Sequence, residues 1–312
     1  MNYRRKLLWL FLKLILMIRC LLLLIFFISN VSASEVLNIT FLGTGTPRPN
    51  LSKLGPSILI KNKTEEILLD VGRGVTLRLN QVGNDYSKIN NIYISHLHYD
   101  HIVGLADFWL TSNLWQKKTD TNIYGPNGIR DFCSGIEKSY LKDIEYRYKK
   151  NKYSKIKCYN FREIFNNKKS TLEVISFKNS HGHVDSYGFK IISGDKIIVY
   201  SGDTTFSDNV IKNSKNSDIL IHEIIASSDK LFKNNKKLQQ VTSTHTTISQ
   251  LIRVLDIAKP KLTILNHALL FGVSENKVLS EIKKKYNGKV IFAEDLMSID
   301  LGNEINIFNI GK

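Results

Sequence analysis

The sequence predicts a layered α/β domain that contains more than one β-sheet. Short β-branched runs alternate with segments of helical periodicity, and several strand-like runs follow one another directly at both ends of the domain. The chain has 312 residues, of which 43% are apolar and 23% charged, and neither Gly nor Pro is in excess. These values exclude collagen, a coiled coil and a largely disordered chain.

The strands are expected where β-branched and aromatic residues form short runs bounded by Gly, Asn or a helical segment. In the first half of the domain they cover Val36–Leu42, Ser57–Lys61, Glu66–Val71, Asn91–Ser95 and Thr121–Tyr124. In the second half they cover Leu172–Phe177, Tyr187–Ile192, Lys196–Tyr200, Asp218–Ile221, Leu262–Leu265, Lys289–Phe292, Ser298–Leu301 and Ile305–Phe308.

Helices are expected where apolar residues recur with 3–4 spacing. The clearest case is Thr247–Ala258, where Thr246 or Thr247 caps the start and Pro260 follows the end. The same pattern predicts helices over Val75–Val82, Gly104–Trp115 and Ser274–Tyr286.

The N-terminal 33 residues have the pattern of a targeting segment. Positive charges precede the apolar run Cys20–Ile28, and small residues end at Ala33, where a signal peptidase would cleave. We therefore predict a signal peptide over residues 1–33 and a catalytic domain over residues 34–312, located in the periplasm or secreted. The alternative is an uncleaved anchor in the inner membrane, so any membrane contact is expected only through this segment. Cys133 and Cys158 would then lie in an oxidising compartment, either paired or as free buried thiols.

The chain is strongly basic, with a formal net charge of +16. The first 33 residues hold five Lys and Arg and no acid, which leaves 39 basic against 28 acidic residues in the domain. This excess favours an anionic substrate, nucleic acid or anionic lipid, but it is also explained by a general Lys and Asn bias of composition. Residues 138–170 are especially basic and rich in Asn and Tyr, and are expected to form a surface insertion.

Three of the eight histidines fall within six residues, in the block His96-Leu97-His98-Tyr99-Asp100-His101. At the end of a strand, side chains at positions i and i+2 point the same way, so His96 and His98 can reach one metal ion. Asp100 and His101 follow on the turn and can serve a second ion. Imidazole and carboxylate groups are the ligands of hydrolytic Zn²⁺ sites, so the block predicts metal binding.

Further ligand-type residues follow other apolar strands. His181 comes after Leu172–Phe177, Asp203 after Lys196–Tyr200, and His267 after Leu262–Leu265. Strand ends at one edge of a layered fold converge, so these segments are expected to complete one constellation. An Asp between two divalent ions can bridge them, which suits Asp203.

These motifs resemble the metallo-β-lactamase superfamily of dinuclear metallohydrolases, whose signature His-x-His-x-Asp-His matches residues 96–101. The resemblance covers nearly all of residues 36–310. The opening loop at 41–47, the Asp-x-Gly-x-Gly turn at 70–74 and His245-Thr246-Thr247 resemble the branch of ribonuclease Z and the arylsulfatase-like enzymes. The resemblance implies a four-layer αββα sandwich and a hydrolase that uses two divalent metal ions, with Zn²⁺ favoured and Mn²⁺ or Fe²⁺ as alternatives.

The resemblance also implies roles for the matching residues. One ion would take His96, His98, His181 and Asp203, and the other would take Asp100, His101, Asp203 and His267. His181 and His183 compete for one position, and His181 is favoured by the pattern that follows it. Asp100 would also orient the attacking water or accept its proton. His245, supported by Glu223, would stabilise developing charge or protonate the leaving group, although Glu223 is equally explained as a buried structural acid.

Three substrate classes remain open. The favoured expectation is an exported hydrolase of small anionic esters, either sulfate or phosphate esters and diesters. The alternative is a ribonuclease Z-like endonuclease that processes tRNA 3′ ends. An export signal argues against it, as does the spacing of 22 positions between His181 and Asp203, which leaves no room for the tRNA-grasping arm of the long forms of ribonuclease Z. A lactam-directed or non-enzymatic relative is disfavoured, because Thr follows Asp203 where lactamases use Cys and because no ligand is missing. The oligomeric state stays open, a homodimer included.

Overall fold

The computed structural model describes residues 36–149, 152–161 and 170–310, together with residues 9, 11, 13, 15, 17 and 19, which are helical. The chain divides into two compact units, Met1–Glu35 and Val36–Lys312, and every element described below belongs to the second unit. Across the described residues, no helix has both the length and the hydropathy needed to cross a membrane. The signal peptide expected over residues 1–33 lies almost entirely outside the described residues, and it stays a prediction, as does the location of the domain.

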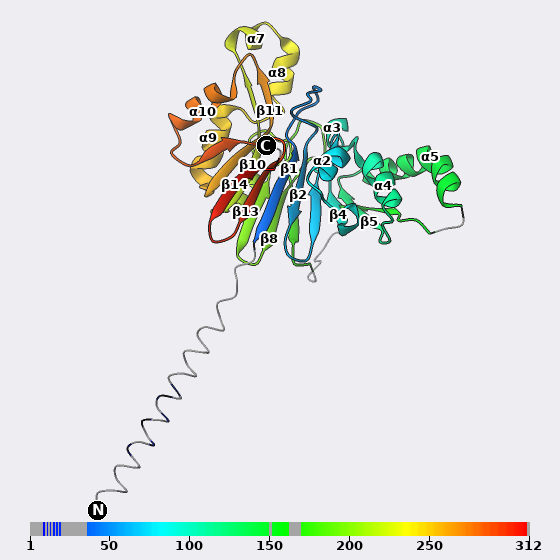
Figure 1. The fold of residues 1–312 in the computed structure, drawn as a ribbon. Helices are drawn as coiled ribbons and strands as arrows, with labels where there is room; N and C mark the ends of the chain where they lie inside the picture. The colour runs from blue at the N-terminus through cyan, green and yellow to red at the C-terminus, as the bar shows by residue number, and fades with distance from the viewer. Residues whose placement is uncertain are drawn as a thin grey trace, which may run out of the picture. The chain divides into compact units, whose positions relative to one another are not determined.

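The domain is built on two sheets (Figure 1). The eight-stranded sheet has the order β14-β13-β1-β2-β3-β4-β5-β6, antiparallel from β14 to β3 and parallel from β3 to β6. Its strands are β1 (Leu37–Gly43), β2 (Ser57–Lys61), β3 (Glu66–Leu69), β4 (Ile89–Tyr93), β5 (Thr121–Gly125), β6 (Ile156–Asn160), β13 (Met297–Leu301) and β14 (Ile305–Asn309).

The six-stranded sheet has the order β12-β11-β10-β9-β8-β7. Strands β9 to β12 run parallel, whereas β7, β8 and β9 form an antiparallel meander. Its strands are β7 (Glu173–Lys178), β8 (Tyr187–Ser193), β9 (Lys196–Tyr200), β10 (Ile219–Ser227), β11 (Leu262–Phe271) and β12 (Val290–Phe292).

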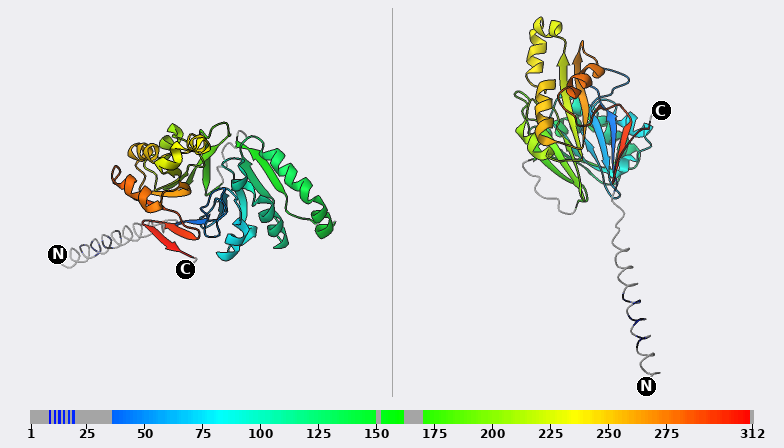
Figure 2. Two further views of the ribbon diagram at one scale, coloured as in Figure 1. Left: turned by 90° about the horizontal axis from the view of Figure 1, so that it is seen from above. Right: turned by 90° about the vertical axis from the view of Figure 1, so that its left-hand side faces the viewer.

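Helices cover the outer faces of both sheets, as the view from above shows (Figure 2). The eight-stranded sheet carries α2 (Val75–Gln81), α3 (Tyr99–Ile102), α4 (Leu105–Leu114) and α5 (Ile129–Tyr148), with a single 3₁₀ turn at Tyr86–Lys88. The six-stranded sheet carries α6 (Asp208–Ser214), α9 (Ile248–Ala258) and α10 (Glu275–Lys283). Two short helices, α7 (Asp229–Lys233) and α8 (Lys236–Thr242), follow β10.

Alternation along the strands explains why the layers form in this order. In β2, Ile58 and Ile60 belong to the apolar cluster between the sheets, whereas Leu59 belongs to the cluster under α2 and α4. Because successive side chains of a strand point to opposite faces, a strand that is apolar throughout must be covered on both sides. A third cluster lies between the six-stranded sheet and helices α6, α9 and α10. The expected four-layer αββα arrangement is therefore confirmed.

Helix α9 illustrates how closely local sequence determines an element. Thr247 caps its start through a capping box with Gln250. The helix ends at Ala258, and Lys259 adopts a left-handed conformation (φ 50°) before Pro260, which cannot continue a helix.

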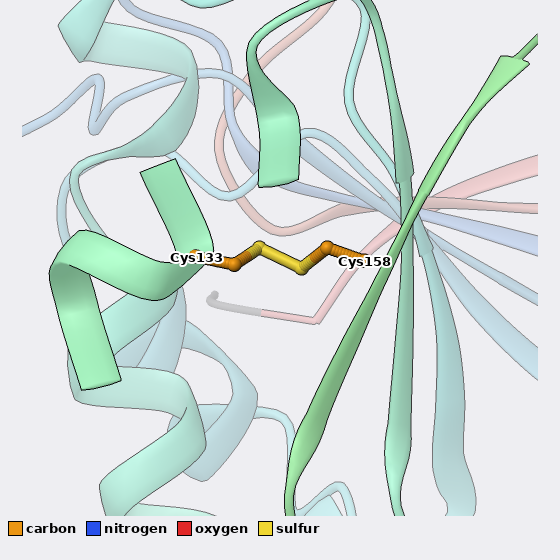
Figure 3. Close-up of a disulfide and its surroundings, with 2 residues drawn as sticks. All are labelled: Cys133 and Cys158. Carbon is orange, nitrogen blue, oxygen red and sulfur yellow. A yellow bond between two sulfur atoms is a disulfide. The ribbon is translucent and has the colours of Figure 1, made fainter. Parts of the chain in front are cut away.

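The basic stretch expected to be a surface insertion contains two elements of the domain instead. Residues 138–148 are the second half of α5, whose Cys133, Ile136 and Ile144 are buried, and residues 156–160 form β6, which pairs with β5. Cys133 and Cys158 form a disulfide that joins α5 to β6, with their Cα atoms 6.5 Å apart (Figure 3). These elements were not predicted because most of their residues are polar. Only a narrow apolar face of each is needed to pack it against the domain. Residues 162–169 of the stretch lie outside the described part of the chain.

Candidate metal centre

Seven His and Asp side chains meet at one edge of the two sheets. The first ligand group comprises His96, His98, His181 and Asp203, and the second comprises Asp100, His101 and His267. Within each group the ligand atoms lie within 4.8 Å of one another. All seven residues that the sequence predicted as metal ligands are thus brought together by the fold.

Asp203 contacts both groups. Its Oδ2 lies 3.2 Å from His267 Nε2 and 3.8 Å from His96 Nε2, and its Oδ1 lies 3.6 Å from His101 Nε2. A carboxylate in this position can bridge two cations, as the sequence predicted for this residue.

The structure distinguishes the two candidate histidines after β7. His181 is buried, and its Nε2 lies 3.3 Å from His98 Nδ1 and 3.9 Å from Asp203 Oδ2. His183 is exposed and belongs to neither ligand group. The glycine between them adopts φ 60°, which turns the chain so that only the first imidazole enters the site.

His267 differs from the expectation that every ligand directly follows a strand. Strand β11 continues through His267 to Phe271, and β10 continues through Glu223 to Ser227. The register between the two strands shifts after His222, and His267 adopts φ 48°. A β-bulge interrupts the ladder here and re-aims the side chain, so a site residue lies within a strand.

Unpaired buried atoms show that the residues present fit two cations. Among the described residues, Asp100 Oδ2, His101 Nε2 and Asp203 Oδ1 are buried and have no hydrogen-bond partner. Leaving such groups unpaired costs about 1–3 kcal/mol each, and more when they are charged. Divalent cations coordinated by nitrogen and oxygen would satisfy all of them.

The pKa directions of three imidazoles agree with this donor set, whereas the carboxylates around His101 favour its protonated form. Burial lowers the pKa values of His96, His98 and His181, so these imidazoles are neutral and able to coordinate a cation. Burial raises the pKa of Asp203, but the neighbouring His267 and His101 outweigh it and hold the pKa well below its usual value. For His101, burial is likewise outweighed by Asp203 and Asp70, which raise its pKa.

Asp70 is the most heavily bonded carboxylate behind the site. It is fully buried and accepts hydrogen bonds from His101 Nδ1 at 2.9 Å, from Tyr200 OH at 2.8 Å, and from Ser95 N and Oγ at 2.7 and 2.9 Å. These bonds fix the ring of His101 so that Nε2 faces the site. The sequence motif at 70–74 marked this residue, but its role was not predicted; its position directly after β3 was the available signal.

Backbone carbonyls orient two other imidazoles. Thr244 O lies 2.8 Å from His181 Nδ1, and Gly45 O lies 2.7 Å from His267 Nδ1. In both residues Nε2 is therefore the nitrogen that faces the site. No sequence pattern indicates these carbonyls, because any residue type supplies one.

His245 and Glu223 form a pair next to the ligands. His245 Nδ1 lies 3.3 Å from Glu223 Oε2 and 4.0 Å from Asp203 Oδ2. Burial lowers the pKa of His245, but Glu223 outweighs it and raises the pKa to about 9. Glu223 also accepts a hydrogen bond from Thr246 N at 2.8 Å, so this buried acid both fixes the loop and holds His245.

These residues open into a cavity of about 730 Å³. Its lining includes five ligand candidates, His245, an apolar wall formed by α8 and the end of β11, and the cations Arg48, Lys53 and Lys237. Residues 46–48, which directly follow the two glycines at 43 and 45, line the cavity. Added Cβ atoms would collide with the carbonyl oxygens of Gly55 at Gly43 and of Lys53 at Gly45, so the close approach of the two ends of this loop requires glycine.

Comparisons with known proteins agree with this geometry. A family model described as anti-Pycsar protein Apyc1 matches residues 37–267. The ribonuclease Z of Archaeoglobus fulgidus is 26% identical, with the match covering 84% of this chain and 97% of the relative. The ribonuclease Z of Pyrococcus furiosus is 29% identical, covering 74% of this chain and 86% of the relative.

Solved structures share the fold. The metallo-β-lactamase fold protein YhfI of Bacillus subtilis matches with a TM-score of 0.67 at 21% identity, covering 85% of this chain and all of YhfI. The short form of human tRNase Z matches with a TM-score of 0.63 at 23% identity, covering 84% of this chain and 98% of the human protein. Zn²⁺-bound PqqB of Methylobacterium extorquens matches with a TM-score of 0.61 at 13% identity, covering 85% of this chain and all of PqqB. The expected metallo-β-lactamase superfamily and its ribonuclease Z branch are confirmed.

The comparisons overturn the favoured substrate expectation. An exported hydrolase of small sulfate or phosphate esters was expected, but the curated relatives are ribonucleases Z. The short spacing between His181 and Asp203 excludes only an arm of the long forms at that point. Because the chain matches 98% of the short human form, the missing arm does not argue against the ribonuclease Z branch.

Proposed function

This chain belongs to the family described as anti-Pycsar protein Apyc1 and is a metal-dependent hydrolase of ester bonds, and on that premise we propose that it cleaves phosphodiester bonds in RNA. The proposal takes its substrate from the name of the curated relatives, ribonuclease Z. The observation that carries it is Asp203, which touches both ligand groups and so suits a two-cation site for phosphoryl chemistry.

Two bound divalent ions, Zn²⁺ in the first instance, would supply Lewis-acid stabilisation of the phosphate and lower the pKa of the attacking water. The His-rich donor set supports Zn²⁺, as does the Zn²⁺ bound by the structural neighbour PqqB.

Two protein groups have proton-transfer roles in this proposal. Asp100 lines the cavity, and its buried Oδ2 has no hydrogen-bond partner among the described residues, so it can accept the proton of the attacking water. His245 is cationic at neutral pH because Glu223 raises its pKa to about 9. With Nδ1 directed at Glu223, Nε2 is the atom left to protonate the departing oxygen of the ribose.

The test uses the purified full chain and a precursor tRNA with a 3′ trailer, with and without a chelator. We expect a single chelator-sensitive cut near the 3′ end of the mature tRNA. Asp203→Asn should abolish the cut, whereas Asp218→Asn, which changes a buried carboxylate that pairs with Lys261, should retain it. An uncut precursor beside chelator-sensitive hydrolysis of bis-p-nitrophenyl phosphate would refute RNA as the substrate.

The family description supports a second candidate, a role against Pycsar. The match spans residues 37–267 and therefore contains all seven ligand candidates. In cells that carry Pycsar, the wild-type chain should suppress its effect and Asp203→Asn should not. Suppression by both proteins would separate that role from hydrolysis.

A further inference from the structure

Among the cations that line the cavity, Arg48 differs in that it lies over an aromatic ring. Its guanidinium carbon lies 4.7 Å from the centroid of the Phe271 ring, and both residues line the cavity that holds the ligand candidates. The ion pairs found in the described ranges do not include Arg48, whereas Lys53 on the same loop pairs with Glu275. Arg48 is exposed, and its N–H groups are available to a ligand.

The loop that bears Arg48 is held firmly against the metal site. Asp295 accepts hydrogen bonds from Thr44 N at 2.9 Å and from Leu54 N at 2.8 Å, which closes the two ends of the loop. Gly45 O lies 2.7 Å from His267 Nδ1, so the loop is tied directly to a ligand candidate. The backbone at both ends of this loop is therefore fixed beside the metal site, and Arg48 lies on the exposed part between them.

Arg48 is also directed by its neighbours. Tyr99 OH donates a hydrogen bond to Pro47 O at 3.0 Å, next to Arg48 in the chain. Phe271 is the last residue of β11, and its carbonyl accepts a hydrogen bond from Ser228 N at 2.9 Å. A guanidinium stacked on an aromatic face keeps the N–H groups along its edge free to bind an anion in a bidentate manner.

We propose that Arg48, stacked on Phe271, forms a subsite for the phosphate next to the scissile one in an RNA strand. The proposal rests on the proposed function, because it assigns a second phosphate of the same substrate. A phosphodiester that contains one phosphate places it at the metal site and leaves the subsite empty. The subsite therefore favours a polynucleotide over a small diester without taking part in bond cleavage.

The decisive experiment compares Arg48→Ala on two substrates. For an RNA oligonucleotide cut at one site, we expect KM to rise about 10- to 100-fold, the usual effect of losing a charged phosphate contact, with kcat nearly unchanged. For bis-p-nitrophenyl phosphate, both constants should stay at their wild-type values. The dependence of RNA affinity on salt should also weaken, by about 0.7 in the slope of log K against log salt.

Control variants separate charge from stacking. Arg253→Ala removes a guanidinium that lies 4.4 Å from the Phe206 ring outside the cavity lining, and it should leave KM for RNA unchanged. Arg48→Lys keeps the charge but loses the planar fork, and Phe271→Leu keeps Arg48 but loses the ring. Both should raise KM for RNA by less than Arg48→Ala does.

A chemically modified RNA tests the contact itself. A neutral methylphosphonate in place of the flanking phosphate should raise KM of the wild-type enzyme about as much as Arg48→Ala, and combining the two changes should add nothing further. Additive effects, or a wild-type KM for Arg48→Ala on RNA, would overturn the subsite.

Binding measured by fluorescence anisotropy after chelator treatment keeps this test apart from that of the proposed function. If RNA is bound through Arg48 but never cut, the phosphate contact of Arg48 is supported and the ribonuclease proposal fails. If RNA is cut and its binding is indifferent to Arg48, the subsite fails alone.

Discussion

Asp70→Asn is expected to weaken metal binding at the second ligand group while leaving the fold intact. The carboxylate is fully buried and accepts four hydrogen bonds, of which the one from His101 Nδ1, at 2.9 Å, orients a ligand candidate. Asn fits the site because it has the same shape and tolerates the left-handed backbone found here, φ 56°. The substitution therefore removes charge and one acceptor without creating a cavity.

The size of the effect on stability and on metal affinity depends on which of the hydrogen-bond donors to Asp70 can find a new partner in the Asn variant. The hydroxyls of Ser95 and Tyr200 can rotate to accept from the new amide, whereas His101 loses its anionic acceptor. We expect a loss of about 1–3 kcal/mol in the free energy of unfolding, the usual effect of one buried group losing its partner. Metal affinity at the second ligand group should fall about 10- to 100-fold, as is typical for partners of ligating histidines.

The assay is competition with a chromophoric chelator, combined with metal analysis after dialysis. Wild-type protein should retain two ions per chain, and Asp70→Asn should lose one of them at a chelator concentration that spares the other. Asp218→Asn, which alters another buried carboxylate away from the ligands, should behave as wild type. Two ions retained by Asp70→Asn with unchanged affinity would show that the network does not tune the site.

Three further predictions concern other parts of the domain. Because Glu223 raises the pKa of His245 to about 9, the imidazolium is present below that pH and lost above it, so kcat should fall as pH rises through about 9. Glu223→Gln should move this fall to lower pH. An unmoved profile would exclude His245 as the acid. Reducing the Cys133–Cys158 disulfide should lower the free energy of unfolding by about 3 kcal/mol in denaturant titrations, and an unchanged midpoint would contradict this. Burial lowers the pKa of Lys117 to about 8, so between about pH 8 and 10.5 the unfolded chain binds a proton that the folded chain lacks. The free energy of unfolding should therefore rise with pH across that window. Lys117→Met should remove the rise.

The sequence predicts the layers and the ligands well for the same physical reason. A strand covered on both faces must be apolar throughout, so runs such as Ser57–Lys61 and Lys196–Tyr200 are recognisable to the residue. The ligand candidates of this chain are all His or Asp, and neither is common in an apolar setting, so each is conspicuous next to its strand. Both patterns depend only on neighbouring residues, so both can be recognised in a single sequence.

Other features could not be predicted because their cause is not local. Strand β6 carries Lys157 and Asn160 and is fixed by pairing with β5 and by the disulfide to α5. Strand β11 continues past Leu265 because its neighbour β10 supplies hydrogen bonds on both sides of a bulge. The carbonyls of Gly45 and Thr244 orient ligands through backbone atoms, which leave no trace in residue type.

The substrate was predicted wrongly because it is determined by a different part of the molecule from the ligands. The ligands are constrained by the chemistry of the cations, so they match across enzymes that act on different esters. Discrimination between a small diester and a polynucleotide requires contacts beyond the reacting phosphate. The rim offers such contacts, because Arg48 lies over the Phe271 ring there and α8 forms part of one wall. Within α7 no residue is buried, and within α8 only Leu238 is. Rim positions therefore tolerate change at little cost in stability, so substrate preference can diverge there while the metal ligands stay the same.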